Sequence, residues 1–126
     1  MSKLHFRGEI GISEYTFNVG LSLVEFQEDD ITIIYSPALD LSGYGYTESE
    51  AKNSFNEALH EFLRYTHNKK TFSSVLKDLG WKAKGKKSPK FSPPLNSDLV
   101  QKNELYHEIV NSKNYKSYSQ DVELSV

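Results

Sequence analysis

The chain has no cysteine among its 126 residues. Disulfides, thiolate metal sites and cysteine nucleophiles are therefore excluded together. It also has no apolar run that approaches the ~20 residues needed to span a bilayer, and its N-terminus lacks the basic-then-apolar order of a signal peptide. These absences predict a soluble, cytoplasmic protein.

A large excess of charge of either sign is also missing. The 15 basic and 17 acidic residues leave a formal net charge of −2. The chain as a whole is therefore not drawn to nucleic acid or to acidic membranes, and contact with a polyanion must come from a local cluster. An apolar fraction of 37% is enough for one modest core at this length, but not for two full domains.

The sequence is poor in motifs for catalysis or for metal and cofactor binding. No Gly-x-Ser-x-Gly elbow, phosphate loop or dinucleotide fingerprint occurs, and a nuclease would need several strand-end acids to hold two Mg²⁺ ions. Asp40 is the one such acid that a recognisable motif places, because the acidic residues 28–30 are typical of a solvated turn. The histidines lack the i, i+4 pairing of a zinc site: His5, His60, His67 and His107. We expect no catalysis, no metal site and no cofactor.

What is present is a pattern of three strands and one long helix. Apolar runs predict strands over Leu4–Ile12, Tyr15–Phe26 and Ile31–Tyr35, and their short connections favour an antiparallel meander. From about Glu48 to Thr66 apolar residues recur at helical spacing: Ala51, Phe55, Ala58, Leu59, Phe62 and Leu63. We expect this stripe to cover one face of the sheet.

The junction between the third strand and this helix carries recognisable turn chemistry. Gly43 and Gly45 are expected to supply backbone freedom, including positive φ, where the chain turns sharply. Asp40 is expected to shape the same turn by accepting hydrogen bonds from backbone amides. Thr47 lies three residues before Glu50, which is the spacing of a capping box and predicts that the helix begins there.

This junction resembles the HicB-like antitoxin family, with a match over roughly residues 8–81. Family members show a strand, a Pro-x-Leu-x-Gly turn and a Thr-x-x-Glu-Ala helix start. This chain has Asp40-Leu41-Ser42-Gly43-Tyr44 where many members have Asp-Leu-Pro-Gly-Cys. The resemblance implies a β-β-β-α-β partial ribonuclease H fold without nuclease activity. It also implies a partner, because HicB-like proteins bind and neutralise a small messenger-RNA-cleaving toxin of the HicA type.

Two tyrosines flank Gly45 at this junction and are the candidate partner-binding residues. Tyr44 and Tyr46 would project from the sheet edge or from the start of the helix. Tyrosine is enriched at binding hot spots because it offers contact area and a polar tip at small entropic cost. The alternative is that one of the two closes the core beneath the turn.

After the long helix the sequence predicts a short helix and a basic linker. The short helix runs from Thr71 to Leu79, and Gly80 ends it as a C-cap. Residues 82–94 are rich in lysine and proline and contain no acid, which is typical of a linker. Its candidate contact residues are Lys84, Lys86, Lys87 and Lys90. These lysines either keep a linker soluble, neutralise phosphates, or meet an acidic patch on a partner protein or another subunit.

Residues 95–126 predict a helix followed by a strand. Asn96 or Ser97 caps the helix. The alternating apolar residues of a half-buried strand come last: Val122, Leu124 and Val126. That strand pairs with the edge of its own sheet or with that of a second copy, and we expect a homo-oligomer. A helix before a strand reverses the ribbon-helix-helix order and a helix-turn-helix needs two helices, so we do not expect sequence-specific DNA binding.

The expected fold class is α+β: a mainly antiparallel sheet of three to four strands with one long helix, β-β-β-α-β-like, plus a C-terminal helix and strand. The expected organisation is a domain over residues 1–81, a linker over 82–94 and an extension over 95–126. The resemblance implies a non-catalytic antitoxin-type protein. Two alternatives remain open: a self-associating HicB-like scaffold domain without a toxin, and a nucleic-acid-binding module that uses the lysine-rich linker.

Overall fold

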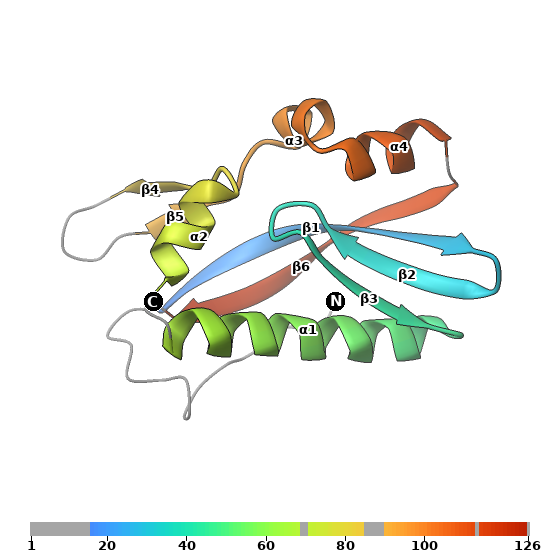
Figure 1. The fold of residues 1–126 in the computed structure, drawn as a ribbon, viewed down its shortest axis with the longest axis horizontal. Helices are drawn as coiled ribbons and strands as arrows, with labels where there is room; N and C mark the ends of the chain where they lie inside the picture. Colours follow the sequence, from blue (N-terminus) through green and yellow to red (C-terminus); the bar gives the residue numbers. More distant parts are fainter. Residues whose placement is uncertain (1–15, 69–70, 85–89, 113, 126) are drawn as a thin grey trace.

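The computed structural model describes residues 16–68, 71–84, 90–112 and 114–125. Its centre is a four-stranded antiparallel sheet in the order β3-β2-β1-β6 (Figure 1). The strands are β1 (Thr16–Glu28), β2 (Ile31–Ser36), β3 (Leu41–Gly45) and β6 (Tyr115–Ser125). The α+β fold expected from the sequence is therefore confirmed.

The described meander contains two of the predicted strands and one strand that was not predicted. The strands predicted at residues 15–26 and 31–35 are β1 and β2, whereas the strand predicted at residues 4–12 lies outside the described residues. The third strand of the meander is β3, which occupies the segment where a turn was expected. Glycine and serine have low strand propensity, so local sequence gives little sign of β3.

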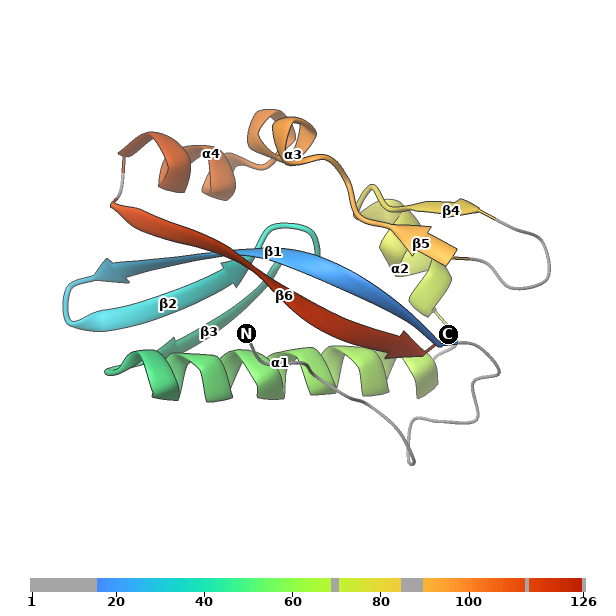
Figure 2. The same cartoon turned by 180° about the vertical axis from the view of Figure 1, so that it is seen from behind.

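Helices lie on both faces of the sheet (Figures 1 and 2). The long helix α1 (Glu48–Asn68) covers one face, and α3 (Asn96–Lys102) and α4 (Glu104–Ser112) lie over the other. The predicted apolar stripe of α1 is turned inward, since four of its members are no more than 3% exposed: Ala51, Phe55, Leu59 and Leu63.

Gly43 and Gly45 serve the fold in a different way from the one predicted. Both lie within β3, and the positive φ of this region belongs to Asp40, at 55°. A Cβ atom at Gly43 would lie 2.6 Å from the Ala51 carbonyl oxygen, and one at Gly45 would lie 2.6 Å from the Ala51 amide nitrogen. The two glycines are therefore needed because α1 packs directly against the backbone of β3.

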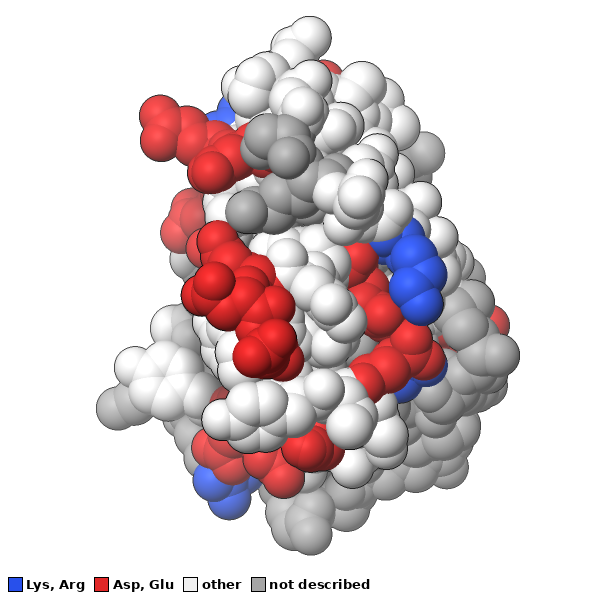
Figure 3. All heavy atoms as spheres, turned by 90° about the vertical axis from the view of Figure 1, so that its right-hand side faces the viewer, with Lys and Arg blue, Asp and Glu red and all other residues white. Residues whose placement is uncertain are grey.

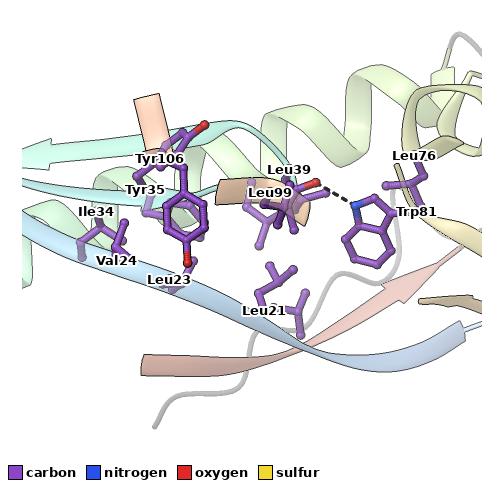
Figure 4. Packing of buried hydrophobic residues seen from close by; sticks show 14 of the residues in the cluster. Leu21, Leu23, Val24, Ile34, Tyr35, Leu39, Leu76, Trp81, Leu99 and Tyr106 are labelled. Carbon is purple, nitrogen blue, oxygen red and sulfur yellow. Dashed lines mark hydrogen bonds between the residues drawn. The ribbon is translucent and has the colours of Figure 1, made fainter. Parts of the chain in front are cut away.

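The short helix α2 (Phe72–Asp78) ends in the predicted glycine C-cap. Gly80 has a φ of 96°, its N–H donates to the Lys77 carbonyl (3.0 Å), and the Trp81 N–H donates to the Leu76 carbonyl (2.9 Å). This pair of bonds is a Schellman motif. It directs Trp81 into the core, where its indole Nε1–H donates to the Ala38 carbonyl at 2.8 Å (Figure 4).

Part of the predicted linker is ordered as a pair of short strands. β4 (Lys82–Lys84) and β5 (Lys90–Ser92) pair antiparallel, and residues 85–89 between them lie outside the described residues. Phe91 is 4% exposed, and its ring packs edge-on against that of Phe72 with centroids 6.3 Å apart. Phe91 therefore anchors to the core a segment whose lysine and proline content is typical of a linker.

The single helix predicted after residue 95 is two helices, α3 and α4. Asn103 between them has an extended backbone (φ −104°, ψ 107°), and its side-chain oxygen accepts a hydrogen bond from the Tyr106 N–H at 3.0 Å. Asn103 is thus the N-cap of α4 and interrupts a run with helical periodicity. One residue separates the two helices, whereas a helix-turn-helix joins its helices by a turn of three or four residues.

The C-terminal segment belongs to the same packed unit as the first part of the chain. β6 pairs with β1 along its whole length, from Thr16 opposite Ser125 to Phe26 opposite Tyr115, so the strand adds to its own sheet. Leu99 from α3 is buried in one cluster with Leu39 and Trp81 (Figure 4). The extension over 95–126 therefore completes the core of the domain before it.

Candidate protein-binding surface

One end of the molecule, where the β1–β2 turn and the start of α1 meet, is hollowed and acidic (Figure 3). The hollow, here called the end groove, has a volume of about 810 Å³ and is open to solvent. Strand ends and the start of α1 line it: Glu25, Phe26, Gln27, Thr32, Tyr46, Thr47, Glu48, Asn114, Tyr115 and Lys116. In Figure 3 acidic side chains gather around the hollow and basic ones are few.

The start of α1 forms one wall of the end groove. The Thr47 hydroxyl accepts a hydrogen bond from the Glu50 N–H at 3.1 Å, and the helix begins at Glu48. The helix start predicted from the Thr47–Glu50 spacing is therefore confirmed. Because Glu48 and Glu50 lie in the first turn, their negative charges face the positive end of the helix dipole.

Both candidate tyrosines are exposed at this end of the molecule. Tyr44 is 57% exposed on β3, and its backbone N–H donates to the Ser54 hydroxyl of α1 at 3.0 Å. Tyr46 is 74% exposed and lines the end groove. Neither ring is used in the core, so the alternative in which one tyrosine closes the core is wrong. A third tyrosine, Tyr115 of β6, is 39% exposed in the same groove. The sequence did not predict it as a site residue, because it belongs to no recognisable motif.

Two carboxylates and two lysines form an ionic cluster in the end groove. Lys116 Nζ lies 3.3 Å from a carboxylate oxygen of Glu25 and 3.2 Å from one of Glu48, and Lys52 Nζ lies 3.1 Å from the other oxygen of Glu48. Hydrogen bonds from Lys52 and Lys116 lower the pKa of Glu48 to about 2, and the contacts of Lys116 with Glu48 and Glu25 raise the pKa of Lys116. The cluster balances its own charge.

The negative charge of this end comes from acids outside that cluster. Glu28, Asp29 and Asp30 are exposed at the β1–β2 turn, where Asp29 has a positive φ of 56°, and Glu50 is exposed on α1. Since Lys52 and Lys116 are already paired with Glu25 and Glu48, Asp29, Asp30 and Glu50 leave the described part of this surface net negative. Such a surface favours a positively charged partner.

Asp40 has a structural partner that the sequence did not indicate. The Tyr35 hydroxyl donates to Asp40 Oδ1 at 2.6 Å and accepts from Asn103 Nδ2 at 2.8 Å. Burial, and then the hydrogen bond to Asp40, raise the pKa of Tyr35. Asp40 therefore links the β2–β3 turn, through Tyr35, to the junction of α3 and α4, in place of the expected bonds to neighbouring amides.

The four candidate lysines are only partly placed by the structure. Lys84 and Lys90 stand opposite each other on β4 and β5, and Lys86 and Lys87 lie outside the described residues. Figure 1 places the β4–β5 pair at the end of the molecule opposite the β1–β2 turn. The strands that carry Lys84 and Lys90 therefore lie away from the acidic end groove.

Neither a metal centre nor a membrane-spanning helix is found in the described ranges. No three His, Asp or Glu side chains within them are grouped closely enough to hold a metal ion. His60 and His107 are on α1 and α4, whereas His5 and the side chain of His67 lie outside the described part. No helix in these ranges is long and apolar enough to cross a membrane.

The chain was also compared with known proteins. Comparisons with protein-family models, with curated proteins and with solved structures found no match.

Proposed function

We propose that this protein is a non-catalytic, HicB-like antitoxin that binds a small HicA-type toxin ribonuclease and covers its active surface. One observation carries the proposal. Tyr46 lines an acidic groove and Tyr44 stands exposed on β3, both at the strand-to-helix junction whose sequence resembles the family.

The charge of the end groove supports a partner of this kind. A ribonuclease must hold a polyanion, and it does so with lysine and arginine side chains. The exposed acids Asp29, Asp30 and Glu50 offer those side chains a competing negative surface. Complementary charge of this kind speeds encounter and selects the partner more than it adds affinity.

The exposed tyrosines supply the anchoring contacts of the proposed complex. Affinity comes from aromatic area buried in pockets of the partner, and the surrounding polar rim excludes water. Neutralisation is steric: the toxin is held with its RNA-binding surface covered, so no bond is made or broken by this chain. The proposal therefore requires no cofactor and no catalytic residue.

The decisive experiment is purification of tagged protein from its native cells, followed by tests on what co-elutes. We expect a small basic protein at equal stoichiometry, which cleaves messenger RNA when separated and stops doing so when the tagged protein is added back. Recovery of a homo-oligomer alone, with no inhibited ribonuclease, would replace the antitoxin proposal by the scaffold alternative.

Replacement of Tyr46 by alanine tests the binding surface. We expect Tyr46→Ala to weaken the toxin complex by ~2 kcal/mol, about thirtyfold in Kd, because it removes a central aromatic anchor. Isothermal titration calorimetry measures the change. Tyr65→Ala is the matched control, since Tyr65 is 64% exposed near the other end of α1. Equal losses in the two variants would show that the end groove is not the binding surface.

A further inference from the structure

The outer edge of β6 is the most regular unpaired surface in the described part of the chain. β6 is the last strand in the sheet order, and its inner side pairs with β1 in eleven successive pairs without a bulge. It contains neither proline nor glycine. A long, unbroken edge strand of this kind is a ready template for pairing with another strand.

β6 also has no unpaired lysine that would oppose pairing with another strand. Edge strands are often protected by a lysine that points into solvent. The lysine of β6 is Lys116, and its ammonium group is paired with Glu25 and Glu48 in the end groove. The middle of the strand carries serine, glutamine and tyrosine, which do not oppose pairing.

We propose that the β6 edge binds the same edge of a second copy of this chain, antiparallel about a two-fold axis at Gln120. Two four-stranded sheets would then join into one continuous sheet of eight strands. Gln120 is the midpoint of Tyr115–Ser125, so this register pairs every residue of the strand.

Strand geometry permits this register. Opposite residues in an antiparallel pair project to the same face, so a strand that pairs with its own copy must match residues whose numbers differ by an even step. Centring on Gln120 satisfies this condition and places Ser119 opposite Asp121 of the second copy. Both are exposed, and a serine hydroxyl can donate to a carboxylate. Tyr118 comes opposite Val122, which makes an apolar pair on the other face.

The buried side chain of Gln120 is the reason to expect a second copy of this chain, and not another protein, at the β6 edge. This side chain is 5% exposed, and its amide nitrogen is buried without a hydrogen-bond partner. A buried donor of this kind is costly until it finds an acceptor. On the two-fold axis the Cβ atoms of the two Gln120 residues would be about 5 Å apart, within reach for each amide N–H to donate to the other's side-chain oxygen. The symmetry supplies both missing acceptors at once.

Charge changes at Ser119 test the register. In the proposed dimer Ser119→Asp places two carboxylates opposite each other at two sites, whereas Ser119→Lys places a lysine opposite Asp121 at the same two sites. We expect the wild type to sediment as a dimer at equilibrium. The dimer Kd should rise about threefold or more in Ser119→Asp and fall in Ser119→Lys. Ser97→Asp on α3, also exposed, is the control and should leave the Kd unchanged.

Cross-linking provides a second measurement that does not depend on affinity. The chain has no cysteine, so a single introduced thiol reports one position. Gln120→Cys should form a covalent dimer under mild oxidation, because the two thiols face each other on the axis, and Ser97→Cys should not. A wild type that sediments as a monomer at every concentration overturns the proposal. So do equal Kd values for the two Ser119 variants, or equal cross-linking of the two cysteine variants.

Discussion

At the scale of single residues, β3 and α1 can pack closely because Gly43 and Gly45 have no Cβ atom. Gly43 lies within β3 with α1 so close that a Cβ atom would lie 2.6 Å from the Cα of Phe55. Gly20, in contrast, lies in β1, where an added Cβ atom would have the Ser119 hydroxyl oxygen as its nearest neighbour at 3.6 Å, an ordinary contact. The sequence marked Gly43 correctly as constrained but attributed the constraint to φ, because the approach of a helix cannot be read from local residues.

The two glycines make a matched pair for a stability measurement. Gly43→Ala should lower the free energy of unfolding by about 3 kcal/mol, because the added methyl group meets helix backbone that cannot move independently. Urea denaturation followed by circular dichroism measures this. Gly20→Ala, which adds the same methyl group to the same sheet, should change stability by less than about 1 kcal/mol. Similar losses in both variants would contradict the packing argument.

At the scale of elements, one asparagine decides how the C-terminal half is divided. Asn103 caps α4 through its side-chain oxygen and donates its amide to the Tyr35 hydroxyl of β2. Local sequence predicted a single helix here, since Leu99, Ile109 and their neighbours keep helical spacing across the break. The contact with Tyr35, 68 residues away, fixes Asn103 in the extended conformation that ends α3.

Removal of the Asn103 side chain should therefore affect both elements. Asn103→Ala loses a helix cap and leaves Tyr35 with one hydrogen bond fewer, and we expect a destabilisation of about 2 kcal/mol. Thermal unfolding measures the change. Asn53→Ala, at an exposed position inside α1, is the control and should be neutral or slightly stabilising because alanine is the better helix former. A neutral result for Asn103→Ala would mean that the cap contributes nothing to the fold.

At the scale of the whole molecule, acidic side chains gather at one end although the net charge is small. The acidic β1–β2 turn and the end groove lie at one end, and the lysine-bearing β4–β5 pair lies at the other (Figure 1). A formal charge of −2 therefore does not reveal the acidic end, where Asp29, Asp30 and Glu50 are exposed. The ionic cluster of the end groove also affects the sheet, because the negative charges of Glu25 and Glu48 help to raise the pKa of Tyr118 in β6.

This coupling predicts how the stability of the whole fold changes in alkali. Burial, assisted by the charges of Glu25 and Glu48, raises the pKa of Tyr118 to about 12, against about 10 in the unfolded chain. The folded state therefore favours the neutral phenol, and this contribution is complete below about pH 10 and is lost as the pH rises from 10 through 12. Urea unfolding at several pH values should show stability falling more steeply over this window in the wild type than in Tyr118→Phe. Identical slopes would contradict the assignment.

The amino-acid sequence by itself determined the features that depend on neighbouring residues. The start of α1 at Thr47, its apolar stripe, the glycine cap after α2 and the strands β1 and β2 are all visible in short windows, because caps and periodicity act within one or two turns of chain. The sequence suggested that Tyr44 and Tyr46 are exposed, but it left open that one of them closes the core.

The tertiary structure determined the features that depend on contacts between residues far apart in the sequence. β3 forms because α1 lies against its glycines, and Asn103 breaks a helix because Tyr35 reaches it from the sheet. The ionic cluster of the end groove forms because β1, α1 and β6 bring carboxylate oxygens of Glu25 and Glu48 within 3.3 Å of Lys116 Nζ. Local patterns carry no record of such contacts, because the free energy that holds them comes from packing and charge pairing between segments that meet only when the sheet has formed.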